Sequence, residues 1–176
     1  MQADNDTNPS FWRKMSGKGG NPVKVVPRNA LIGAIGGFTA ILLLAYLSDL
    51  TTAAWMMAPF GATSVLAFGL WDAPLSQPRH IIGGHFISTL VGLVCLHLFG
   101  SSNEVLAAAV GLSIALMMLT RTTHPPAGAD PLVVILSGSG WSFLIAPVLI
   151  GSVLIVIVAL IMNNLDSKRS YPTFWM

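Results

Sequence analysis

Histidines and one acid are the residues of this sequence whose types and spacing could do chemistry. His124 and Asp130 lie in the stretch THPPAGADPL, and His85 lies in the apolar stretch IIGGHFIS. An ionisable side chain at membrane depth predicts a functional site. An imidazole there could donate a hydrogen bond to an anion, or titrate near neutral pH and couple transport to protons.

Asp130 admits two interpretations. Aspartate is a favoured helix N-cap, and proline at the next position, Pro131, is favoured in the first helical turn. We therefore expect the Asp130 carboxylate to accept hydrogen bonds from the backbone N–H groups of a helix that begins there. If it titrates instead, it is a candidate proton-coupling or cation-binding group.

The composition places these residues in a membrane. The chain has 176 residues, of which 53% are hydrophobic and 9% charged, and its mean hydropathy is +0.71. A soluble domain carries about a quarter charged residues. The formal net charge of +2 is too small to indicate a nucleic-acid partner, so the lipid bilayer is the expected environment. One cysteine, Cys95, excludes a disulfide framework or a cysteine metal site.

The pattern does not indicate an enzyme. His80 and His85 are five positions apart and do not share a helix face. There is no HExxH motif and no paired-carboxylate motif in the sequence. We expect no catalytic residues, no cofactor and no bound metal.

Four apolar runs are long enough to cross a bilayer, which takes about 20 residues or somewhat fewer. They cover residues 30–48, 81–100, 105–120 and 141–163. Two segments between them are interrupted by proline and glycine: the first broken segment, 51–70, and the second broken segment, 122–138.

The two broken segments match one another in sequence. PFGATSVLAFG and PPAGADPLVVI share a Pro-x-Gly-Ala pattern, which places Pro59 on Pro126 and Thr63 on Asp130. The chain therefore predicts an all-α membrane protein of two halves, each a helix, a broken element and a helix. The halves cover 30–100 and 105–163, between a polar N-terminal arm, 1–29, and a C-terminal tail, 164–176.

Charge predicts the topology. Six crossings from a cytoplasmic N-terminus place Arg79, Arg121, Lys168 and Arg169 in the cytoplasm, as the positive-inside rule favours. The alternative is four spans with re-entrant broken segments, which would place Arg79 and Arg121 outside. Three crossings in each half make the second half inverted relative to the first, an arrangement typical of transporters. We expect a multi-pass protein of a bacterial inner membrane. Rows of small residues, such as Gly84, Ser88 and Gly92, indicate close helix packing or oligomer contacts.

A short helix that begins at Thr63 or at Asp130 would direct its free N–H groups toward the protein centre, which favours an anion. Glycines in the shared pattern would allow a tight bend or a close approach of another backbone. The predicted substrate-binding residues are Gly61, Ala62, Thr63, Ser64, His85, His124, Gly128, Ala129 and Asp130.

Three stretches resemble the HPP family of integral membrane proteins: His124-Pro125-Pro126, APFGATSVLAFG at 58–69, and PLSQPRHIIGGHFIS at 74–88. The resemblance covers about residues 30–162 and implies a membrane protein that is usually described with four transmembrane helices, not six. It also implies nitrite as the substrate, because chloroplast and cyanobacterial members are implicated in nitrite transport.

Three functions follow as hypotheses. The first is a transporter or channel for a small monovalent anion, nitrite above all, with its site at two opposed half-helix N-termini. The second is a proton- or cation-coupled carrier that uses Asp130 and His124. The third is a membrane scaffold without a transport pathway. A chain of this size would need an oligomer to shield a polar interior, so we expect a homo-oligomer.

Overall fold

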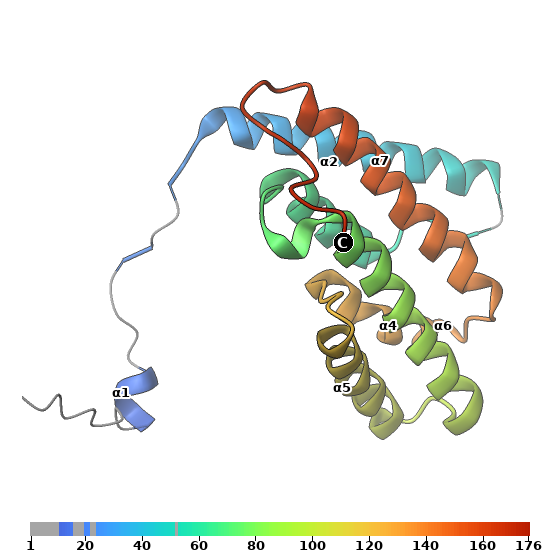
Figure 1. Ribbon diagram of the computed structural model, residues 1–176. Helices are drawn as coiled ribbons and strands as arrows, with labels where there is room; N and C mark the ends of the chain where they lie inside the picture. The colour runs from blue at the N-terminus through green and yellow to red at the C-terminus, as the bar shows by residue number, and fades with distance from the viewer. Residues whose placement is uncertain (1–10, 16–19, 22–23, 52) are drawn as a thin grey trace, which may run out of the picture.

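The computed structural model describes residues 11–15, 20–21, 24–51 and 53–176, and every regular element in these ranges is helical (Figure 1). Much of the predicted N-terminal arm lies outside the described residues, as does Thr52 of the first broken segment. The part of the arm that is described contains the one-turn helix α1, Phe11–Met15.

Four helices contain the predicted apolar runs. They are α2 (Pro27–Leu50), α4 (Pro78–Phe99), α5 (Asn103–Leu119) and α7 (Ile150–Asn164). Helix α7 follows a π-helical turn, η4 (Leu144–Leu149), which is kinked at Ala146, where the backbone is not helical (φ −126°, ψ 118°). In the described part of the chain, three helical stretches are long and apolar enough to span a membrane: Pro27–Leu50, Pro78–Phe99 and Leu144–Asn164. Helix α5 is apolar but shorter, with 17 residues. The prediction of an all-helical membrane protein is confirmed; the inverted repeat and the six crossings stay predictions.

The chain returns repeatedly to one end of the helix bundle. Arg28 at the start of α2 forms an ion pair with Asp166, just after α7. Arg79 at the start of α4 donates hydrogen bonds to the carbonyl oxygens of Arg121 (3.1 Å) and Thr120 (2.9 Å), after the end of α5. Tyr171, which follows α7, donates a hydrogen bond to the carbonyl oxygen of Ser76, just before α4. The starts of α2 and α4 and the ends of α5 and α7 therefore lie at one end of the bundle, which we call the gathered end.

The first broken segment folds as a short helix, α3 (Ala58–Ser64), that continues into a π-helical turn, η1 (Val65–Gly69). Met57 is extended and Pro59 lies in the first turn, where the missing proline N–H removes no helical hydrogen bond. The helix therefore begins at Ala58, and the prediction that it begins at Thr63 is wrong. Thr63 lies in the last turn of α3 and its hydroxyl is 3.0 Å from the carbonyl oxygen of Pro59.

The second broken segment folds differently. His124 is extended, with φ −134° and ψ 103°, and is followed by a 3₁₀ turn, η3 (Pro125–Ala129), and by helix α6 (Asp130–Ser137). The predicted helix start at Asp130 is confirmed. The predicted N-cap role of Asp130 is wrong, because Asp130 is already helical and Ala129 occupies the capping position.

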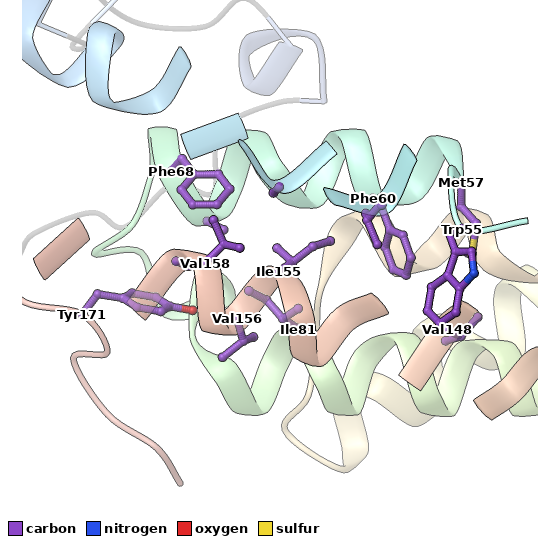
Figure 2. Close-up of a cluster of buried hydrophobic side chains, with 14 residues drawn as sticks. Trp55, Met57, Phe60, Phe68, Ile81, Val148, Ile155, Val156, Val158 and Tyr171 are labelled. Atoms are coloured by element: carbon purple, nitrogen blue, oxygen red, sulfur yellow. The ribbon is translucent and has the colours of Figure 1, made fainter. Parts of the chain in front are cut away.

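Aromatic rings of the first broken segment hold it against α2 and α7. Phe60 and Phe68 are fully buried, and Figure 2 shows them in the same cluster as Ile155 of α7. Gly151 leaves the space for Phe60: a Cβ on this glycine would lie 2.5 Å from the Phe60 ring. The first broken segment is thus fixed by side chains that enter niches left by glycine.

The second broken segment packs directly against the predicted row of small residues on α4. A Cβ on Gly84 would lie 2.6 Å from the Cβ of His124 and would overlap the backbone before it. Ser88 donates a hydrogen bond of 2.5 Å to the carbonyl oxygen of Ala127. A Cβ on Gly92 would lie 2.8 Å from the backbone of the first turn of α6. The row therefore lets the backbone around the His-Pro-Pro stretch lie directly on α4.

Candidate functional site

Four polar side chains meet in the interior, and each is fully buried: Thr63, His85, His124 and Asp130. The Thr63 hydroxyl lies 2.8 Å from Nε2 of His85 and 3.0 Å from Nε2 of His124. Nδ1 of His85 lies 2.7 Å from Oδ2 of Asp130. We call this chain of hydrogen bonds the buried network. It joins Thr63 and Asp130, the two matched positions of the broken segments, through one histidine on α4.

Each end of the buried network has a further contact. Nδ1 of His124 lies 2.8 Å from the carbonyl oxygen of Leu75, in the connection between η1 and α4. At the other end, Thr89 donates a hydrogen bond of 3.4 Å to Oδ2 of Asp130, while Oδ1 of Asp130 is buried and has no hydrogen-bond partner among the described residues. The Phe60 ring lies edge-on to His85, with centroids 5.1 Å apart, and adds an apolar wall.

The partner of His124 fixes where its proton lies. A carbonyl oxygen only accepts hydrogen bonds, so Nδ1 of His124 must carry a hydrogen to bond Leu75. In a neutral imidazole Nε2 is then an acceptor for the Thr63 hydroxyl, which also donates to the carbonyl oxygen of Pro59 at 3.0 Å. The single hydroxyl hydrogen of Thr63 is shared between Pro59 and His124, so Thr63 offers His85 an acceptor.

The proton count of the other two groups is fixed in the same way. Nε2 of His85 then donates to Thr63, because the hydroxyl hydrogen of Thr63 is directed to Pro59 or to His124. Nδ1 of His85 then either accepts from a protonated Asp130 or, in an imidazolium, donates to an ionised Asp130. In both arrangements the pair holds one shared proton and has no net charge. Without that proton, Asp130 would carry an uncompensated negative charge, and the lone pair on Nδ1 of His85 would face a lone pair of the Asp130 carboxylate. Both are costly in a protein interior.

The remaining predicted site residues lie apart from the buried network. Gly61 and Ser64 line an open groove of about 760 Å³ between α2 and the first broken segment. Ala62 is exposed, and Ser64 donates its hydroxyl to the carbonyl oxygen of Phe60. Gly128 and Ala129 are half-buried in η3.

Two expectations about these residues are wrong. A Cβ on Gly61 or Gly128 would meet no atom of the described residues within 4 Å, so neither glycine serves a close approach of another backbone. The predicted pair of helix N-termini facing one site is also wrong, because Thr63 lies near the end of its helix. The matched positions, Thr63 and Asp130, do meet at His85, but they contact it with their side chains and not with helix N-termini.

Sequence reasoning missed two contributors to the buried network. Thr89 lies four residues after His85, one helical turn away, so the spacing could have placed it beside the same carboxylate. Leu75 contributes a backbone oxygen, and no residue type signals such a role in advance.

Comparisons with known proteins agree with a membrane protein. Residues 22–172 match the family described as HPP, transmembrane region. Two transmembrane proteins of Dictyostelium discoideum are 36% and 34% identical to the chain, over 94% of its length in both cases. The chain spans 63% and 57% of the length of these two relatives. No solved structure matches the chain.

The family match covers the three stretches that carry the resemblance, and it includes every residue of the buried network. It extends from before α2 to the tail that follows α7. The chain belongs to the HPP family of transmembrane proteins.

Proposed function

We propose that this protein is a transporter that moves a small monovalent anion together with a proton, and that the Asp130–His85 pair holds the proton. The observation that carries the proposal is the buried network, in which two broken segments meet at one ionisable pair. Ionisable groups are rare at membrane depth and mark proton relays and substrate paths. The acid is bonded to histidine and not to a helix N-terminus, which favours proton coupling over a pure anion site.

Six crossings in two inverted halves suit this function. The shift of 67 positions that places Thr63 on Asp130 also places Gly84 on Gly151. These two glycines have related tasks, since each admits a side chain of a broken segment, His124 in one case and Phe60 in the other. Both broken segments are followed by a long helix that supplies this glycine.

The gathered end of the bundle is the proposed cytoplasmic side. Among the described residues, this end has two acids, Asp72 and Asp166, against a larger number of bases. The bases there are Lys24, Arg28, Arg79, Arg121, Lys168 and Arg169. Such an excess is typical of cytoplasmic loops. An inner bacterial membrane and a homo-oligomer belong to the same proposal.

Nitrite is the proposed anion, because the family resemblance implies it. The groove lined by Gly61 and Ser64 is the proposed approach for the substrate, since it reaches α3 on the face opposite the buried network. Lys24 at the groove supplies positive charge toward an arriving anion, and Asp72 lines the same groove.

The test is nitrite uptake into proteoliposomes under an inward proton gradient, compared with Asp130→Asn. The asparagine amide can donate to Nδ1 of His85 as protonated Asp130 would, so this variant imitates the protonated pair. We expect Asp130→Asn to lose accumulation driven by the gradient and to keep nitrite exchange at equal concentrations. Glu104→Gln, an exposed acid at the start of α5, is the matched control and should behave as wild type.

Empty liposomes measure the leak of nitrous acid, and nitrate and formate test selectivity. If Asp130→Asn still accumulates nitrite along the proton gradient, the coupling is wrong and an uncoupled anion path remains. If wild type equals empty liposomes for every anion, transport itself is wrong and the scaffold hypothesis takes its place.

A further inference from the structure

The tail that follows α7 folds back over the gathered end of the bundle (Figure 1). Arg169, which is 6% exposed, anchors it. Its guanidinium donates to the carbonyl oxygen of Phe68 (3.1 Å) and to Oδ1 of Asn163 (2.8 Å), and lies 5.6 Å from the ring centre of Trp71. The tail is therefore tied to the end of the first broken segment.

Two further tail residues hold the connection that leads from η1 to α4, residues 71–77, which we call the loop. The hydroxyl of Tyr171 donates to the carbonyl oxygen of Ser76 at 2.9 Å. The backbone N–H of Thr173 donates to Oε1 of Gln77 at 2.8 Å. Gln77 is fully buried, and its amide nitrogen donates back to the carbonyl oxygens of Trp71 (3.0 Å) and Ala73 (2.9 Å). The tail thus fixes the outer side of the loop.

The inner side of the same loop belongs to the buried network. The carbonyl oxygen of Leu75 accepts from His124, and the next carbonyl oxygen along the chain, that of Ser76, accepts from Tyr171. One short piece of backbone is held between a network histidine and a tail tyrosine. Figure 2 shows Tyr171 beside the buried cluster, where it is 2% exposed.

We infer that the tail is a latch for the buried network and that Tyr171 is a positioning residue for His124. While Tyr171 holds Ser76, the oxygen of Leu75 stays on Nδ1 of His124 and keeps that proton from the solution. Release of the tail lets the loop move away, and the proton of His124 can then exchange at this end. The inference rests on the proposed function, since it assigns the control of proton access to that network.

The groups around the latch suit this role. Burial raises the pKa of the Tyr171 phenol above its ordinary value, so the hydroxyl remains a donor at physiological pH. The titratable groups that face His124 are His85 and His80, and Nδ1 of His80 lies 2.8 Å from the carbonyl oxygen of Thr123. The Phe174 ring of the tail lies 6.0 Å from His80, so the tail also covers this neighbour. Around Arg169 the charged groups are Asp166, Arg28 and Asp72.

The experiment compares wild type with Tyr171→Phe, which removes one hydroxyl and keeps the ring. Tyr46→Phe is the matched control, because Tyr46 is the other tyrosine of the chain and is exposed on α2. Hydrogen–deuterium exchange of the loop should rise about fivefold in Tyr171→Phe, as the loss of one hydrogen bond permits, while α5 stays unchanged. In proteoliposomes without substrate, entry of protons should rise in the same variant only.

The outcomes separate the latch from the proposed function. Faster exchange of the loop together with faster proton entry supports the latch. If nitrite transport by wild type and its proton coupling are normal but Tyr171→Phe leaves proton entry unchanged, the latch is overturned and the proposed function stands. If wild type transports no anion and admits no protons, both are overturned.

Discussion

The two broken segments start from the same Pro-x-Gly-Ala pattern and reach different structures. In the first, the pattern lies inside helix α3. In the second, the same pattern forms the 3₁₀ turn η3, and the helix begins where the pattern ends. The residue directly before the pattern differs, since Ala58 stands where the second segment has Pro125.

A second proline changes the backbone in two ways. Pro125 restricts His124 to extended conformations, and Pro125 and Pro126 together offer no N–H at two successive positions. The first segment has one proline, placed in the first turn of α3, where no N–H is needed. The double proline therefore sets the position of His124, while the single proline starts a helix that presents Thr63.

The segments are also held by different means, and this leads to the largest predicted effect. Around Gly84 a Cβ would meet the His124 Cβ and the Thr122 carbonyl oxygen (2.9 Å), which cannot move without the backbone. Around Gly151 it would meet the outer edge of the Phe60 ring, which can tilt. We expect Gly84→Ala to cost about 3 kcal/mol of unfolding free energy and Gly151→Ala about 1 kcal/mol, within the range for overpacking.

Unfolding of both variants in the same detergent checks this order. Gly61→Ala is the control without overpacking, because a Cβ at Gly61 faces open space among the described residues. Equal losses of unfolding free energy for Gly84→Ala and Gly151→Ala would contradict this distinction, in which Gly84 contacts backbone that cannot move and Gly151 contacts a side chain that can.

The next effect concerns the contact between the segments. Thr63→Val keeps the shape but leaves Nε2 of both His85 and His124 without their partner, which costs about 1–3 kcal/mol for a buried polar group. Thr63→Ser keeps the hydroxyl and should retain proton-coupled uptake. Uptake and thermal unfolding of both variants decide the point, and full activity of Thr63→Val would show that the two segments act independently.

The smallest effects come from exchanging the distinguishing residue. Ala58→Pro places proline at the first position of α3, where the N–H has no partner within the helix, and should stabilise the protein by about 0.4–1 kcal/mol. Pro125→Ala should destabilise it by a similar amount, since it frees the unfolded chain and removes the restriction on His124. Chemical unfolding measures both changes. A loss of stability in Ala58→Pro would contradict the expectation that α3 accepts proline at its first position, and a gain in Pro125→Ala would contradict the restriction of His124 by Pro125.

Much of the fold was predictable, because the length of an apolar run and the position of a proline determine where a helix forms and begins without reference to distant residues. The four runs and the helix start at Asp130 followed from hydrophobic length and from Pro131. The start of α3 was missed because a shared pattern was read as a shared structure, although one residue ahead of it differs.

The site was predictable in its members but not in its connections. His85, His124, Thr63 and Asp130 stood out as polar types in apolar surroundings. Their pairing depends on how α4 lies between the two segments, and this in turn depends on the glycine row. The sequence around Asp130 does not indicate that its carboxylate bonds His85 and not the N–H groups of a helix N-terminus.

The shortness of α3 and α6 has a consequence for how the protein is made. They hold 7 and 8 residues, against about 20 for a segment that enters a bilayer by itself. Each can therefore enter the membrane only against the surface of a long helix, and Nδ1 of His85 has no partner until α6 has been made, although Nε2 can already contact Thr63 of α3. We expect a nascent chain that stops after α4 to be held by the insertion machinery and removed by membrane proteases, because His85 then lacks the hydrogen-bond partner that Asp130 provides.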